Sequence, residues 1–188
     1  MENGDPRKAA VGLILMYHRI GVSGLDPWGL AVSPAHFAEH LAVLRQHGRT
    51  APLARVVETL RDGTLPSRTL VVTFDDGYAD NLYNARPLLE RYDVPATVFV
   101  ATGHIGSDRE FWWDELEEIL RRPQVLPGQL RLNAYGRTLE WTLDEACRYP
   151  EEQRRSDAGG RAAGLGGPSP RDALYRAVHR ALLPMDSG

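Results

Sequence analysis

The stretch Thr69-Leu70-Val71-Val72-Thr73-Phe74-Asp75-Asp76-Gly77 decides how this chain is expected to fold. Its first six residues are apolar or β-branched, which is the composition of a buried strand. Two adjacent carboxylates follow, and then a glycine that permits a sharp change of backbone direction. In α/β folds with parallel strands, ligands and catalytic groups gather at the carboxyl ends of the strands. Asp-Asp-Gly is also a common turn sequence, so the neighbouring segments must decide between a turn and a site.

Strands and helices alternate on both sides of this stretch, which favours a site. A strand, a helix and a second strand joined by short links form a right-handed βαβ unit. Pro87 interrupts the helix after Gly77 and should kink it or displace its first turn, and Asp80 and Asn81 should cap its start. We expect strands at Val11–Tyr17 and Pro95–Ala101, helices at about 34–47, 53–61, 80–92, 111–122 and 172–183, and a hairpin of 130–133 and 138–141 that turns at Tyr135-Gly136. The fold class is therefore α/β with buried parallel strands.

Composition limits the classes of function. The 188 residues carry a net charge of −3 and no block of Lys or Arg, which argues against a nucleic-acid partner. The single cysteine, Cys147, excludes an intrachain disulfide and a cysteine zinc cluster. No apolar run is long enough for a membrane span or a signal-peptide core, so we expect a cytoplasmic location.

The chain is expected to form one domain with loosely ordered segments around it. We expect a flexible N-terminus at 1–10 and a folded segment at 11–150. Residues 151–170 are rich in Arg, Gly, Ala and Ser, with little to bury, which predicts a disordered loop. A helical segment at 171–188 follows.

Candidate functional residues lie where the predicted strands end. One of the two carboxylates, Asp75 and Asp76, could bind a divalent cation while the other takes a proton from water. His18 and His104 follow the strands on either side, although a single histidine there could equally be a polar strand end or a cap. Trp113, beside Trp112, could stack on a sugar or anchor its helix in the core.

Four segments together resemble the polysaccharide deacetylase family, and more narrowly its exopolysaccharide-associated branch. The resemblance covers most of Val11–Leu120 and continues weakly into Tyr175–Leu183. The segments are Tyr17-His18-Arg19, Thr73-Phe74-Asp75-Asp76-Gly77-Tyr78-Ala79-Asp80, Pro95-Ala96-Thr97-Val98-Phe99-Val100 and Phe111-Trp112-Trp113-Asp114.

The resemblance implies an irregular parallel (β/α) barrel. It implies a metal-dependent hydrolase that removes acetyl groups from carbon–nitrogen (non-peptide) acetamide bonds, or from acetyl esters, of a polysaccharide or oligosaccharide. Asp75 corresponds to the general base and Asp76 to a ligand of a divalent metal, zinc before other ions. The ion polarises the acetyl carbonyl in such enzymes.

The chain also departs from the family. Members of the family carry a His-Ser/Thr-x-x-His motif, an Arg-x-Pro segment and a general-acid histidine after the Phe-Trp-Trp-Asp region. None of these is present in this sequence. His179 is the only histidine after Trp113 and has no partner four residues away. Because catalytic zinc normally takes three protein ligands, we expect an N-terminal part of the domain, with an incomplete barrel. We expect this chain to be poorly stable and inactive alone.

Two alternatives remain. The chain could be a non-catalytic remnant that serves as a carbohydrate-binding or interaction module. The sequence His36-Phe37-Ala38-Glu39-His40 also has the His-x-x-Glu-His spacing of one class of metalloproteases, although this spacing equally suits the polar face of an ordinary amphipathic helix.

Overall fold

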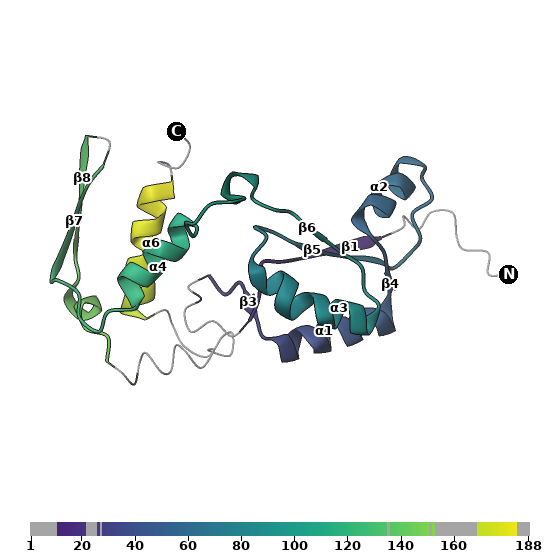
Figure 1. Cartoon of the computed structure of the whole chain (residues 1–188), viewed down its shortest axis with the longest axis horizontal. Helices are drawn as coiled ribbons and strands as arrows, with labels where there is room; N and C mark the ends of the chain where they lie inside the picture. The colour runs from purple at the N-terminus through teal and green to yellow at the C-terminus, as the bar shows by residue number, and fades with distance from the viewer. Residues whose placement is uncertain are drawn as a thin grey trace. The chain divides into compact units, whose positions relative to one another are not determined.

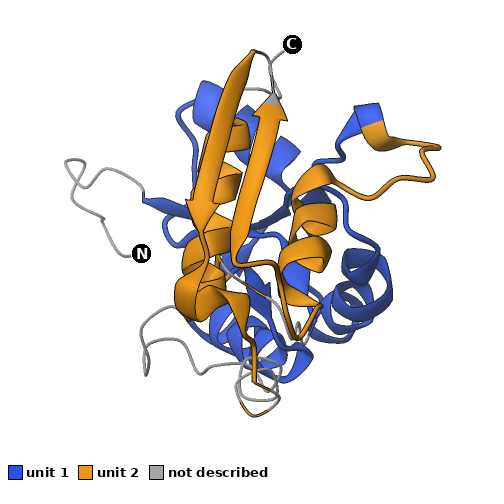
Figure 2. Cartoon of the chain, turned by 90° about the vertical axis from the view of Figure 1, so that its left-hand side faces the viewer, with its two compact units in different colours: residues 1–22, 30–103 blue, residues 23–29, 104–188 orange. Residues whose placement is uncertain are grey.

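The computed structural model describes residues 11–21, 26, 28–134, 136–150, 152 and 169–183. They fall into two compact units, which we describe separately: unit 1 is Met1–Val22 with Leu30–Gly103, and unit 2 is Ser23–Gly29 with His104–Gly188 (Figure 2). The prediction of one folded segment at 11–150 did not separate these units. The predicted flexible segment 1–10, most of the loop 151–170 and Tyr135 of the hairpin turn lie outside the described residues.

Unit 1 is built on a parallel sheet with β5 (Thr69–Phe74) at its centre. Strand β1 (Gly12–Tyr17) pairs with β5 along its whole length, from Gly12 beside Thr69 to Tyr17 beside Phe74. Strands β4 (Arg49–Thr50) and β6 (Ala96–Val98) pair with the start and the end of β5. The expected α/β class with parallel strands is confirmed. Within the described residues, these strands do not close into a barrel.

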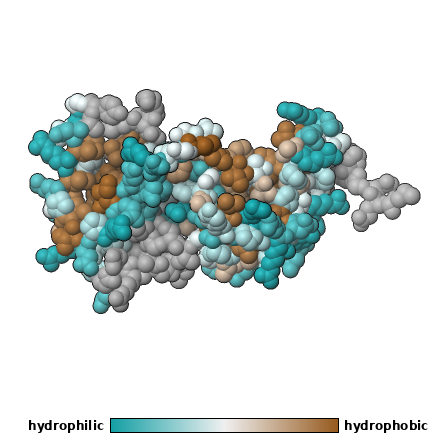
Figure 3. Space-filling model, in the orientation of Figure 1, coloured by the Kyte–Doolittle hydropathy of each residue, from teal (hydrophilic) through white to brown (hydrophobic). Residues whose placement is uncertain are grey.

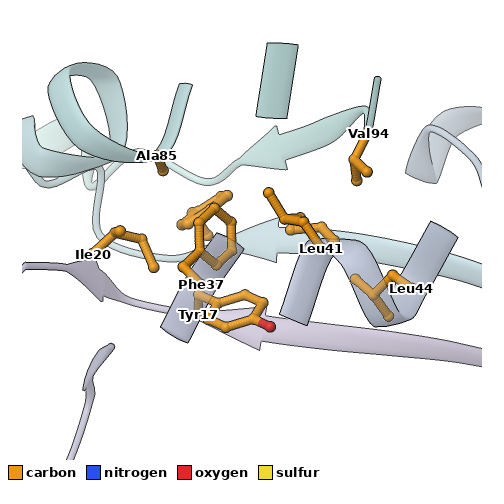
Figure 4. Close-up of a cluster of buried hydrophobic side chains, with 9 residues drawn as sticks. Tyr17, Ile20, Phe37, Leu41, Leu44, Ala85 and Val94 are labelled. Atoms are coloured by element: carbon orange, nitrogen blue, oxygen red, sulfur yellow. The ribbon is translucent and has the colours of Figure 1, made fainter. Parts of the chain in front are cut away.

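The core of unit 1 lies between one face of this sheet and two helices, α1 (Pro34–His47) and α3 (Arg86–Tyr92), while α2 (Leu53–Arg61) lies on the other face (Figure 1). Alternate strand residues point to this core because successive side chains of a strand face opposite sides. Figure 4 shows side chains of the cluster, which comprises Tyr17, Ile20, Phe37, Leu41, Leu44, Val72, Phe74, Ala85 and Val94.

Helix α1 forms where its caps predict. The Ser33 side chain accepts a hydrogen bond from the His36 N–H at 3.2 Å, Pro34 begins the helix, and Gly48 ends it. Gly48 is needed for space, since a Cβ there would lie 2.7 Å from the Arg68 carbonyl oxygen.

Two strands are less buried than predicted. We expected β1 to be covered on both faces, but Leu13 and Ile14 are each 55% exposed and Met16 is 61% exposed. The predicted strand Pro95–Ala101 is shortened to β6, and Val98 is 45% exposed. Within the described residues, both strands pair on one side only. Each therefore lies at an edge of the sheet, where fewer neighbouring elements cover its side chains.

The helix after Gly77 begins with a π-helical turn, η1 (Asn81–Ala85), before α3. The displacement expected from Pro87 is confirmed, because Pro87 lies in the first turn of α3 and cannot donate to the preceding turn. The expected capping by Asp80 and Asn81 is wrong: no side-chain cap bond forms, and both side chains bind the segment after β1 instead.

Near the end of β1, β2 (Arg19–Ile20) pairs in parallel with β3 (Ala31–Val32).

Unit 2 has its own core. Helices α4 (Trp112–Arg121) and α6 (Pro170–Leu182) pack together, beside the antiparallel hairpin of β7 (Gln129–Ala134) and β8 (Arg137–Thr142) and the 3-10 turn η3 (Asp144–Cys147). A second 3-10 turn, η2 (Thr102–His104), spans the boundary of the units. Helix α6 starts two residues earlier than predicted, because Ser169 and Asp172 form a capping box. The buried apolar residues are Leu120, Leu143, Ala146, Leu174, Tyr175 and Val178.

Among the described residues, no helix is both long and apolar enough to cross a membrane.

Candidate active site at the ends of β1 and β5

Asp75 is the last residue of the central strand to take part in its ladder. Its N–H donates to the Tyr17 carbonyl at 2.9 Å, which extends the pairing of β1 and β5 by one residue. Its own carbonyl accepts from the Gly77 N–H at 2.9 Å. Asp75 and Asp76 are both half-buried. The two carboxylates therefore stand where the ladder ends and the chain turns.

The backbone turns through two consecutive left-handed residues. Asp76 has a φ of 71° and Gly77 a φ of 78°, and the Ala101 N–H donates to the Asp76 carbonyl at 3.4 Å. A non-glycine residue in this region is uncommon and costs free energy, and such strain gathers at functional sites. The turn therefore prevents Asp76 from following the strand alternation set by Phe74 and Asp75.

His18 lies at the same edge of the sheet. It follows Tyr17, whose register partner is Phe74, so the residues after β1 and β5 emerge together. Its carbonyl accepts a hydrogen bond from the Asn81 Nδ2 at 2.9 Å, and the residue is half-buried. The sequence placed His18 at a strand end without a relation to Asp75, and the register brings the two together.

Three side chains that the sequence analysis did not assign to a site also bind here. Asp80, Asn81 and Asn84, from the η1 region, all hydrogen-bond to the segment His18–Ile20. The spacing Asp80-Asn81-x-x-Asn84 directly after the carboxylates was the only signal, and it resembles an ordinary helix start.

His104 and Trp113 belong to unit 2 and are not brought to Asp75 by any described contact. The exposed His104 ring lies 4.3 Å from the Phe111 ring, and Phe111 stacks on Trp113 at 4.6 Å with an interplanar angle of 8°. The Trp113 carbonyl accepts from the Tyr175 hydroxyl at 3.2 Å. Trp113 thus takes part in aromatic packing at the start of α4, and its role in substrate binding stays a prediction.

The histidines of α1 do not assemble a metalloprotease site among the described residues. The Tyr17 hydroxyl and Nδ1 of His40 lie 3.2 Å apart, and burial raises the pKa of that hydroxyl. His36 lies in the exposed first turn of the helix.

A complete metal site is likewise not formed by the residues described. Carboxylate oxygens such as those of Asp75 and Asp76 suit divalent cations. However, nowhere in the described ranges do three or more His, Cys, Asp or Glu side chains gather where they could hold one ion. Catalytic zinc usually needs three protein ligands, so these residues fit only part of such a site.

An apolar groove of about 810 Å³ runs beside the turn in unit 1. Its walls come from η1, α3 and β6, and Gly77 and Tyr78 also line it. A Cβ on Gly77 would lie 3.2 Å from Val100 Cγ1, so glycine also permits the close approach of this loop. The lining is mostly apolar, with charged residues of α3 at its rim, and suits packing better than binding of a sugar.

Comparisons with known proteins find similar sequences in one family. Residues 62–126, which include β5 and both carboxylates, match the family model described as Polysaccharide deacetylase. YxkH of Bacillus subtilis, which is named for the same family, is 30% identical over 108 residues, covering 56% of this chain and 37% of that protein. The poly-beta-1,6-N-acetyl-D-glucosamine N-deacetylase of Staphylococcus aureus is 32% identical over 79 residues, covering 42% of this chain and 27% of that protein.

Among solved structures, IcaB from Ammonifex degensii matches with 29% identity and a TM-score of 0.46, over 57% of this chain and 47% of that one. The chain thus spans between 27% and 37% of the length of the two curated relatives named above. Residues 62–126 thus match the polysaccharide deacetylase family, and the chain is similar to a part of these two curated relatives.

Proposed function

We propose that this chain supplies the base and one metal ligand of a carbohydrate deacetylase site. The observation that carries the proposal is the pair Asp75 and Asp76 in a strained turn at the end of the central parallel strand, inside the segment that matches the family. The substrate class is an N- or O-acetylated carbohydrate polymer, by analogy with the relatives. The cytoplasmic location expected from the sequence stays a prediction.

The roles follow from the positions of the side chains. Asp75, at the last rung of the ladder, is the base that takes a proton from the attacking water. To His18, which follows the neighbouring strand β1, we assign protonation of the leaving nitrogen or oxygen, in place of the general-acid histidine that family members carry after the Phe-Trp-Trp-Asp region. Asp76 contributes one carboxylate ligand to a divalent ion, zinc before others, whose further ligands lie outside the described residues. We therefore expect no acetate release from the described residues alone.

The test replaces the two carboxylates one at a time in the longest natural protein that contains this sequence, whether or not it extends beyond these 188 residues, which we call the full-length protein. Asp75→Asn should lower acetate release from N-acetylglucosamine oligomers by about a thousandfold or more, because the base is lost, and should leave zinc affinity within about twofold. Asp76→Asn should lower zinc affinity itself by at least about tenfold, because a ligand is lost. Acetate is measured enzymatically and zinc binding by calorimetry.

The matched control is Asp62→Asn, since Asp62 is an exposed carboxylate at the end of α2. Asp62→Asn should change neither acetate release nor zinc affinity. Loss of zinc with Asp75→Asn, and its retention with Asp76→Asn, would mean that the two roles are reversed.

The alternative of a non-catalytic carbohydrate-binding or interaction module rests on the incomplete ligand set. It predicts that the unmodified full-length protein binds acetylated oligomers without releasing acetate, and that Asp75→Asn leaves this binding unchanged.

A further inference from the structure

The π-helical turn η1 lies directly after the two carboxylates and points its polar side chains at one short segment. π-Helical turns are rare and are frequently found at functional sites. Here the turn and the residue before it bring Asp80, Asn81 and Asn84 to the segment His18–Ile20, which lies about 60 residues earlier in the chain.

Asp80 makes two of the contacts. Its Oδ1 accepts from the Ile20 backbone N–H at 3.0 Å, and its Oδ2 accepts from Arg19 Nε at 3.1 Å. The Arg19 guanidinium also lies over the Tyr78 ring, 4.6 Å from its centroid. Hydrogen bonds that involve a charged group are about twice as strong as neutral ones. One carboxylate therefore holds both the backbone and the side chain of the segment.

Asn81 and Asn84 complete the arrangement. Asn81 Nδ2 donates to the His18 carbonyl at 2.9 Å and to Asp80 Oδ1 at 3.1 Å, and this side chain is only 7% exposed. Asn84 Nδ2 donates to the Ile20 carbonyl at 2.8 Å. Each backbone residue from 18 to 20 is thus bonded directly, or through its side chain, to the η1 region.

These bonds bear on His18 more than on the core. Ile20 is fully buried, so packing holds its side chain, whereas its backbone N–H is held by Asp80. The backbone of His18 belongs to no strand and is bonded by Asn81, while the preceding carbonyl, that of Tyr17, accepts from Asp75. Anchors on both sides therefore fix the backbone from which the His18 side chain projects at the end of β1.

We propose that Asp80 and Asn81 are positioning residues that hold His18 beside Asp75 for proton transfer to the leaving group. The inference rests on the proposed function for the reaction and on the hydrogen bonds above for the geometry. Positioning of this kind can contribute strongly to rate, because a small displacement of a catalytic group costs much of its effect.

The experiment compares Asp80→Ala with Asp80→Glu, which keeps the carboxylate, in the full-length protein. The first measurement is amide hydrogen exchange. Asp80→Ala should raise exchange of the Ile20 N–H by about tenfold to a hundredfold, because a charged acceptor is lost, while the Val72 N–H of β5 keeps its rate. Asp80→Glu should restore part of the protection.

The second measurement is the kinetics of acetate release. Asp80→Ala should lower kcat by about tenfold or more and leave KM within about twofold, because the donor is displaced while substrate contacts remain. Zinc affinity should not change. The control is Arg86→Ala, which removes an exposed ion pair with Glu90 in the next turn of the same helix and should leave both readouts unchanged.

Equal acceleration at Ile20 and Val72 would overturn the proposal, since Asp80 would then only stabilise the unit as a whole. An unchanged kcat with faster exchange at Ile20 alone would overturn it as well. If the unmodified protein releases no acetate, the proposed function fails, and the exchange pattern by itself decides whether Asp80 fixes the His18 segment.

Discussion

At the scale of single residues, the turn Asp76-Gly77 combines a strained backbone with a candidate metal ligand. Two successive left-handed residues end the central strand, and only the second is a glycine. The left-handed region costs an L-residue about 1–2 kcal/mol, so Asp76 occupies a position where glycine would be more stable. A carboxylate kept under strain is consistent with its proposed role as a ligand.

Replacement of Gly77 by alanine tests how tightly the turn is packed against Val100. Gly77→Ala should destabilise the protein by about 2–4 kcal/mol, because its φ of 78° is strained for alanine and the new methyl would meet Val100. Gly63 is the matched control, with a φ of 67° and no atom within 4 Å of a Cβ. Gly63→Ala should cost only about 1–2 kcal/mol in urea unfolding, the cost of φ alone. Equal effects of the two changes would show that Val100 does not restrict the turn.

At the scale of elements, unit 2 depends on buried polar contacts as well as apolar ones. Arg171, near the start of α6, is 1% exposed, and burial lowers its pKa. Its guanidinium donates to backbone carbonyls of Leu120, Pro123, Gln124, Ala146 and Cys147. One side chain thus satisfies the end of α4 and the turn η3, groups that would otherwise be buried without partners.

Helix α6 also carries a group that should make stability depend on pH. Burial lowers the pKa of His179, whose ring packs 4.8 Å from Trp112, 5.1 Å from Trp28 and 5.7 Å from Tyr175. The unfolded chain then binds a proton more readily than the folded one, so stability is full above the unfolded pKa of about 6.5 and falls as pH drops below it.

The melting temperature followed by tryptophan fluorescence should therefore fall between about pH 7.5 and pH 5.5. His179→Gln should flatten this dependence, whereas His47→Gln, an exposed change in α1, should not. An unchanged pH profile in His179→Gln would assign the effect to the carboxylates.

At the scale of the whole molecule, two separate cores predict two unfolding transitions. All four tryptophans, Trp28, Trp112, Trp113 and Trp141, lie in unit 2. Fluorescence therefore reports on that unit, whereas far-ultraviolet circular dichroism reports on both.

Leu41→Ala, in the core of unit 1, should destabilise that unit by about 2–5 kcal/mol and shift part of the dichroism transition while the fluorescence transition stays in place. Leu174→Ala, in the core of unit 2, should shift the fluorescence transition by a similar free energy. If Leu41→Ala shifts both transitions together, the units unfold cooperatively and the division does not hold in solution.

Exposed apolar side chains are the other feature of the whole molecule. Figure 3 shows hydrophobic patches among the charged residues of the visible face. The exposed apolar side chains of unit 1 include Ile14 and Met16 of β1, Val98 of β6, and Phe99 and Val100 after it, and an apolar groove lies beside α3. Large apolar patches and unpaired strand edges favour association, which agrees with the prediction that this chain is poorly stable alone, a prediction still to be tested.

The sequence by itself determined what depends on near neighbours. The strand Thr69–Phe74, the Ser33 cap and the displaced start at Pro87 follow from side-chain chemistry within a few residues. The carboxylates Asp75 and Asp76 could be predicted as a candidate site, because a strand end followed by glycine has a local pattern. The family resemblance predicted their separate roles.

Only the tertiary structure decided what depends on distant parts of the chain. Asp80 looked like a helix cap, and it binds Arg19 and Ile20 because the β1–β5 register brings them together. The exposure of β1 follows from its place at an edge of the sheet, and the burial of Arg171 from carbonyls collected from three separate segments. A local pattern records propensity, whereas contacts across 25 to 61 residues exist only once the chain has closed on itself.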